Sequence, residues 1–239
     1  MTFDDHISTF KYAFPKTIPI LAGFAFLGMS YGIYMNSLGF EPIYAISMSL
    51  FIFAGSMEFV AGSLLLGPFA PLSAFLLTLM INARHLFYGI AMLDKFKGTG
   101  KKKPYLIYGM CDESFVINST THLPPYINQG WFMFYVTLVN QIYWVGGTTI
   151  GSLFSSAISF NTEGLEFVMV ALFVVIFLDR WMKERNHVSS LIGIGASVLS
   201  LLVFGTDNFI IPAMILILIS LTGIKKTIEK REEIGRAHV

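Results

Sequence analysis

Four short stretches of this sequence place ionisable or strongly polar side chains in otherwise apolar surroundings. They lie at residues 53–59, 82–89, 111–115 and 207–208. Because burying an ionisable group in an apolar segment is costly, such groups are the first candidates for a functional site.

The first stretch combines small residues with one carboxylate. Gly55 and Ser56 allow another backbone to approach closely, and they favour an interruption of a helix at this point. Glu58 stands within a run that is otherwise apolar. This carboxylate either binds a cationic group of a substrate or serves a structural purpose, as a hydrogen-bond acceptor for a neighbouring helix.

The second stretch, 82–89, carries an arginine, a histidine and a tyrosine. Arg84 and Tyr88 are four residues apart and therefore share one face of a helix. The planar guanidinium of Arg84 suits a carboxylate, and His85 can change its charge near neutral pH. The alternative is an arginine near a helix end that extends to lipid headgroups. The position of Arg84, roughly two and a half turns before Asp94, argues against that alternative.

The third stretch contains two adjacent carboxylates, Asp112 and Glu113. In an apolar segment they cannot both be ionised cheaply, so we expect one of them to carry a proton. The alternative is that 105–122 is an interfacial loop in which both are solvated. In the fourth stretch, Asp207 is better explained by a loop or a helix start.

Long apolar blocks must position these residues. Of 239 residues, 54% are hydrophobic and only 13% are charged, against about 25% in soluble domains. A helix crosses the hydrocarbon core with about 20 apolar residues. We therefore predict an all-α integral membrane protein with about seven (six to eight) transmembrane segments. The candidate segments are 17–36, 43–66, 69–93, 105–122, 131–155, 164–182, 188–205 and 207–224.

The domain organisation follows from these blocks. Residues 1–15 have helical apolar spacing and predict an amphipathic helix on the membrane surface, ended by Pro15, with a frayed terminus as the alternative. We expect a single membrane domain over 16–225 and a cytoplasmic tail over 226–239. The last six residues, Ile234–Val239, have the form of translated sequencing-adapter DNA, and we expect them not to be native.

Basic residues predict the orientation. Lys95–Lys103, Arg180–Arg185 and the region from Lys225 onward should be cytoplasmic, and the loop near Asn161 should lie outside. Lys11 and Lys16 suggest a cytoplasmic N-terminus, yet three full crossings would then place Lys101–Lys103 outside. Broken or re-entrant helices near 53–67 and 105–122 would remove this conflict.

Other classes of function have little support in the sequence. The net charge of +1 provides no electrostatic basis for binding nucleic acid. Cys111 is the single cysteine, and the sequence has no HExxH, GxSxG or Walker A motif and no paired metal ligands. We therefore expect neither an enzyme nor a bound cofactor or metal. The pairs Gly28/Gly32 and Gly147/Gly151 are typical of close helix packing.

Three of these stretches together resemble the AzlC family, the large subunits of two-component branched-chain amino acid exporters. Residues 53–59 are similar to its FAGSxQF motif, 82–89 to its NxRHxLYG motif and 112–115 to its DExF motif. The order and spacing of the motifs also match, over roughly residues 10–225. Glu58 departs from the pattern, because the family has glutamine there.

The resemblance implies a bacterial inner-membrane exporter of branched-chain amino acids that works with a small AzlD-type membrane partner. A zwitterionic substrate needs a cation, Arg84 or a helix N-terminus near Gly55, and an anion, Glu58 or Asp112 with Glu113. The expected substrate-binding residues are Gly55, Ser56, Glu58, Asn82, Arg84 and Tyr88. With no nucleotide-binding motif, a proton gradient is the expected energy source, and its candidate carriers are Asp112, Glu113 and His85.

The alternatives to this hypothesis are a transporter of another small solute and an accessory or sensory membrane subunit without transport activity. An intramembrane enzyme acting through Asp112 or Glu113 comes last.

Overall fold

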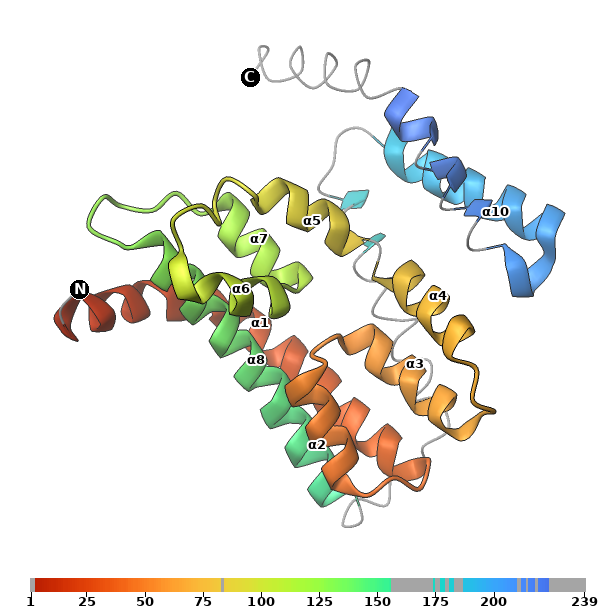
Figure 1. Cartoon of the computed structure of the whole chain (residues 1–239), viewed down its shortest axis with the longest axis horizontal. Coiled ribbons are helices and arrows are strands. Elements are labelled where there is room, and N and C mark those ends of the chain that lie inside the picture. The colour runs from red at the N-terminus through yellow and green to blue at the C-terminus, as the bar shows by residue number, and fades with distance from the viewer. Residues whose placement is uncertain are drawn as a thin grey trace. The chain divides into compact units, whose positions relative to one another are not determined.

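The computed structural model describes residues 3–82, 84–155, 174, 177–178, 181–182, 187–209, 212–213, 215–217 and 219–223. In this part of the chain all regular secondary structure is helical, as the sequence predicts (Figure 1). The chain forms two compact units, Met1–Val170 and Ala171–Val239, and each is described by itself.

Helix α1 covers Phe3–Ser37 and runs through both Pro15 and Pro19. The prediction that a separate N-terminal helix ends at Pro15 is therefore wrong. Prolines are tolerated inside a long helix when other groups satisfy the freed carbonyls and a neighbouring helix supports the bend. Here the first turns of α1 pack on α8, where the rings of His6 and Trp131 lie 4.4 Å apart.

Helix α8, Gln129–Phe154, runs parallel to α1 (Figure 1). Its beginning lies against the beginning of α1, and its second half lies against the second half of α1. Glycines permit this contact, because a Cβ on Gly28 would stand 2.7 Å from the Trp144 carbonyl oxygen, and one on Gly147 would stand 2.7 Å from the Ala25 carbonyl oxygen. The prediction that these glycines serve helix packing is confirmed.

Helices α2, Pro42–Phe51, and α3, Gly55–Leu66, form a helical pair interrupted at residues 52–54. Phe53 adopts a positive φ of 48°, which is rare outside glycine. The pair starts and finishes at the C-terminal end of α1, since the Tyr34 hydroxyl is hydrogen-bonded to Ser63 at 2.8 Å. The interruption that the small residues predict is therefore present, and the pair has the form of a re-entrant segment.

Helices α4, Pro71–Ile81, and α5, Arg84–Met92, together occupy the predicted segment 69–93. The sequence predicted one continuous crossing here. The structure instead bends by 52° between the two helices, so Arg84 begins a helix rather than standing inside one.

The 3-10 turn Gly100–Lys102 leads into α6, Lys103–Tyr108, and then into α7, Asp112–Thr120. These helices form a second pair, interrupted at residues 109–111. Both ends of this pair lie where α8 begins. Lys102 stands over the Trp131 ring at 4.5 Å, and Lys95 donates to the carbonyls of Asn118 and Ser119 at the end of α7.

The two interrupted pairs thus enter from opposite ends of the first unit. Helices α1 and α8 run in the same direction. The chain between them must therefore pass back from the end where α1 finishes to the end where α8 begins, and α4 with α5 makes this passage. The basic segment Lys95–Lys103 consequently lies at the end where α1 and α8 begin. The charge pattern predicts that this segment lies on the same side as the N-terminus, and its place relative to a membrane stays a prediction.

The structure tests the number of crossings only in part. Within the described residues, 5–37 and 188–205 are helices long and apolar enough to cross a membrane, and α4 with α5 is a third if the bent pair counts as one. In the second unit α10 covers Val188–Asn208, with a kink at Gly205, where φ is 71°. Most of the predicted segment 164–182 and the tail 226–239 lie outside the described residues.

Candidate functional site

The interruption between α6 and α7 brings a carboxylate to an arginine. Asp112, the first residue of α7, forms an ion pair with Arg84 at 3.1 Å. It also accepts a hydrogen bond from the Tyr88 hydroxyl at 2.9 Å. Arg84 and Tyr88 come from consecutive turns of α5, so the prediction that they share one helix face is confirmed. The pair is partly accessible, with 36% of the Arg84 side chain and 26% of the Asp112 side chain exposed.

Aromatic contacts hold these groups in place. The rings of Tyr88 and Phe115 stack with centroids 4.3 Å apart, and His85 meets Tyr88 edge-on at 5.5 Å. His85 Nδ1 lies 3.2 Å from the carbonyl oxygen of Asn82, the residue that closes α4. The bend between α4 and α5 therefore delivers Asn82, Arg84, His85 and Tyr88 to one cluster.

Glu113 lies beside Asp112 in the first turn of α7. The N-terminus of a helix carries partial positive charge, which favours carboxylates there. On the opposite side of this turn, Ser114 is fully buried and lies 3.2 Å from the Cys111 sulfur. The adjacent carboxylates are thus at a helix start, with an arginine beside one of them, rather than in the middle of an apolar helix.

The interruption between α2 and α3 is built differently. Glu58 is fully buried, and its two oxygens accept hydrogen bonds from the Ala54 backbone N–H at 2.8 Å and the Trp144 indole N–H at 3.2 Å. Gly55 lies under the same indole, because a Cβ there would stand 3.1 Å from the Trp144 ring. This geometry favours the structural alternative for Glu58. Ser56 follows as the half-buried second residue of α3.

The predicted site residues therefore fall into two clusters. Gly55, Ser56 and Glu58 belong to the α2–α3 interruption, and the other six belong to the cluster around the Arg84–Asp112 pair. The two interruptions meet at the Leu50 carbonyl, which accepts from the Tyr108 hydroxyl at 2.5 Å and from the Gln141 amide at 3.1 Å.

The residues that reasoning from the sequence missed lie on α8. Asn140 donates to Ser114 at 3.1 Å, Gln141 donates to the Leu50 carbonyl, and Trp144 donates to Glu58. One face of α8 therefore forms hydrogen bonds to both helix interruptions. A signal was present in the sequence, because Asn140 and Gln141 are polar residues in the charge-free stretch 114–162.

This arrangement is suited to binding a small zwitterion. A partly accessible ion pair can open, and each member can then take the oppositely charged group of a ligand. Within the described residues no group of three or more His, Cys, Asp or Glu side chains is placed to hold a metal ion.

Comparison with known proteins gives consistent matches. A family model described as AzlC protein matches residues 19–158. The chain is 63% identical to the branched-chain amino acid transport protein AzlC of Bacillus subtilis, over 94% of this chain and 89% of that protein. It is 49% identical to an uncharacterized membrane protein of Haemophilus influenzae, over 89% and 87% of the two chains.

A more distant match is also a membrane protein. The inner membrane protein YgaZ of Escherichia coli is 25% identical over 87% of this chain and 86% of its own length. No solved structure matches.

Proposed function

Since this chain belongs to the AzlC family, we propose that it is the large subunit of a secondary transporter that exports branched-chain or other neutral aliphatic amino acids. In this proposal the protein works in the bacterial inner membrane. Two observations support the proposal: the similarity to the branched-chain amino acid transport protein of Bacillus subtilis, and the ion pair that the interrupted helices assemble.

The observation that carries the proposal is the Arg84–Asp112 pair beside Tyr88. An amino acid presents a carboxylate and an ammonium group on neighbouring atoms, which match the two members of this pair. Arg84 binds the substrate carboxylate, and ionised Asp112 binds the ammonium. The Tyr88 and Phe115 rings supply apolar surface next to the pair, where an aliphatic side chain can lie.

In this proposal, a proton and the substrate ammonium compete for the Asp112 carboxylate, and this competition couples transport to a proton gradient. Asp112 binds an ammonium group only when it is ionised, so a proton and a substrate exclude each other there. A carrier with this property exchanges substrate leaving the cell for protons entering it. Glu113 in the same turn and His85 in the same cluster are the other proposed proton carriers.

Orientation and partner complete the proposal. Lys95–Lys103 and the C-terminus face the cytoplasm, in agreement with the distribution of basic residues. A small AzlD-type membrane protein assembles with this chain. The side chains exposed on α4 and α5 are largely apolar, as a lipid-facing or partner-facing surface requires, among them Leu72, Phe75, Leu76, Leu86 and Ile90.

Counterflow in proteoliposomes tests the proposal. The purified chain, with and without the partner, is assayed with a panel of labelled amino acids and with organic acids of similar size. Leucine, isoleucine and valine should exchange, and aspartate and lysine should not. Exchange of an organic acid alone would point to another solute, and no exchange of any compound with the partner present would favour an accessory role.

A further inference from the structure

A cavity of about 360 Å³ lies between the end of α7, the following loop and the start of α8. It is separate from the Arg84–Asp112 pair, because Asp112 begins α7 and Asn118 lies near its end, roughly 9 Å further along the helix axis. Its lining includes Lys95, Asn118, Leu123, Phe132 and Met133.

One side of the cavity is polar and carries a positive charge. The Lys95 ammonium donates to the carbonyls of Asn118 and Ser119, each at 2.7 Å. An ammonium has three N–H donors, so one remains for a ligand. In the part of the chain that the structure describes, Lys95 forms no ion pair. An anionic group is therefore the natural ligand for this side.

The same side offers a hydrogen-bond acceptor that nothing occupies. Asn118 is only 7% exposed, and its Oδ1 has no hydrogen-bond partner among the described residues. Buried polar atoms are almost always satisfied, so an orphaned acceptor in the wall of a cavity points to a ligand that donates a hydrogen bond.

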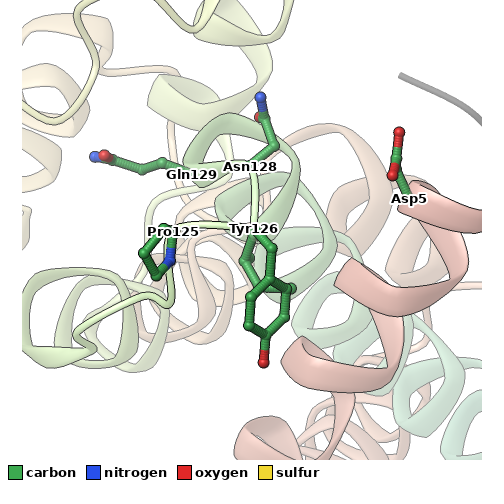
Figure 2. A pocket seen from close by; sticks show the side chains of 6 residues that line it. Asp5, Pro125, Tyr126, Asn128 and Gln129 are labelled. Atoms are coloured by element: carbon green, nitrogen blue, oxygen red, sulfur yellow. The ribbon is translucent and has the colours of Figure 1, made fainter.

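Other residues that line the cavity are apolar. Phe132 and Met133 belong to the buried core of the first unit, and Leu123 packs against that core. A ligand that fits must therefore combine an anionic group, a donor and a small apolar part. The neighbouring hollow, lined by Asp5 and residues 125–129, lacks this organisation, because its labelled side chains point in different directions (Figure 2).

We propose that this cavity is a second binding site for a neutral amino acid with an aliphatic side chain, at the end of the protein that carries Lys95–Lys103. The ligand carboxylate binds Lys95, its ammonium donates to Asn118 Oδ1, and its side chain lies on Leu123 and Met133. The identity of the ligand rests on the proposed function. At the cytoplasmic end, such a site captures substrate before it reaches Arg84 and Asp112.

Equilibrium binding of labelled leucine to the purified protein with its partner tests the site. The wild-type protein should bind about two equivalents, and Arg84→Ala should keep one. Asn118→Leu and Lys95→Gln should each weaken binding at the second site by at least tenfold, and each should also keep one equivalent. Lys97→Gln is the matched control, since Lys97 is exposed and paired with Asp94, and it should bind like the wild type.

The outcomes separate this site from the transport site. The wild-type protein could instead bind a single equivalent of leucine, which Arg84→Ala removes and Lys95→Gln leaves unchanged. That result would overturn the second site while leaving the proposed function intact. No leucine binding to any variant, together with no counterflow, would overturn both. Displacement of the second equivalent by anionic lipid but not by isoleucine would identify a headgroup site and reject the proposal.

Discussion

The two helix interruptions hold their carboxylates in contrasting ways. At the α2–α3 interruption Glu58 is fully buried and accepts two N–H hydrogen bonds, one from its own chain turn and one from Trp144. At the α6–α7 interruption Asp112 is partly exposed and faces the guanidinium of Arg84 and the hydroxyl of Tyr88.

The difference separates structural from exchangeable acidic groups. Two fixed N–H donors and full burial favour a structural role for Glu58, in which it holds the backbone around Phe53 against α8. An ion pair with partial access can release either member to a ligand. We therefore expect the two carboxylates to differ in function because their donors and their exposure differ.

The largest expected effect comes from Arg84→Ala. Removing one partner of a buried ion pair typically costs roughly 3–5 kcal/mol, and the partial exposure of this pair places the loss of stability at the lower end. Counterflow should nevertheless fall to background, because the substrate carboxylate loses its cation. The protein should still reach the membrane, as quantified by immunoblot. Normal counterflow by a well-expressed Arg84→Ala protein would remove this residue from the site.

A smaller and more selective effect is expected from Asp112→Asn. The amide keeps the shape and can still accept from Tyr88, but it cannot titrate. Exchange at equal concentrations should persist at a reduced rate, while accumulation driven by a pH step should disappear. Glu113→Gln is the comparison within the same helix turn. If both variants still accumulate substrate after a pH step, His85 or another driving ion must take the place of these carboxylates.

The contrast between the interruptions is sharpened by Glu58→Gln, which restores the residue usual in the family. Glutamine keeps one acceptor oxygen, so one of the two N–H bonds survives, while its NH2 group leaves the other buried N–H without an acceptor and the stability should fall by about 1–3 kcal/mol. Counterflow of leucine should stay within roughly threefold of the wild type, a difference below 1 kcal/mol. Loss of exchange in a variant of unchanged thermal stability would show that Glu58 binds substrate.

The smallest effect on transport is expected from single cysteines that report topology in a Cys111→Ser background. If the two interrupted pairs enter from opposite ends, cysteines at 41 and 68 should react with a membrane-impermeant reagent from outside, and one at 102 should not. A cysteine at 161 should also react from outside. External labelling at position 102 would mean that an additional full crossing exists, and it would reject the re-entrant description.

Much of this fold could be predicted from local pattern. Apolar length located α8 and α10, and the small residues at 54–56 located the α2–α3 interruption. The bend before Arg84 could not be predicted, because no proline or glycine interrupts the apolar run from 72 to 82. Helix α1 continued past Pro15 for a reason that lies outside its own sequence, namely its packing on α8.

The candidate site was predicted in its residue types but not in its grouping. Arg84, Tyr88 and Asp112 were each identified, and the structure joins them in one cluster. The role of Glu58 depended on Trp144, a partner 86 residues away in the sequence. A contact of that range leaves no periodic trace in a single sequence, so the sequence alone leaves the structural and the substrate-binding alternatives open.

The glycine contact between α1 and α8 also sets an order for the assembly of the protein during its synthesis. Residues 38–128 are made after α1 is complete and before α8 begins. At typical rates of about 5–20 residues per second, this interval lasts roughly 5–20 s. Both interrupted pairs emerge in that interval, before the polar face of α8 exists to satisfy them. A chain stalled before residue 129 should therefore hold Glu58 and Ser114 without their α8 partners, Trp144 and Asn140. It should be the form most dependent on insertion factors and most exposed to membrane proteases.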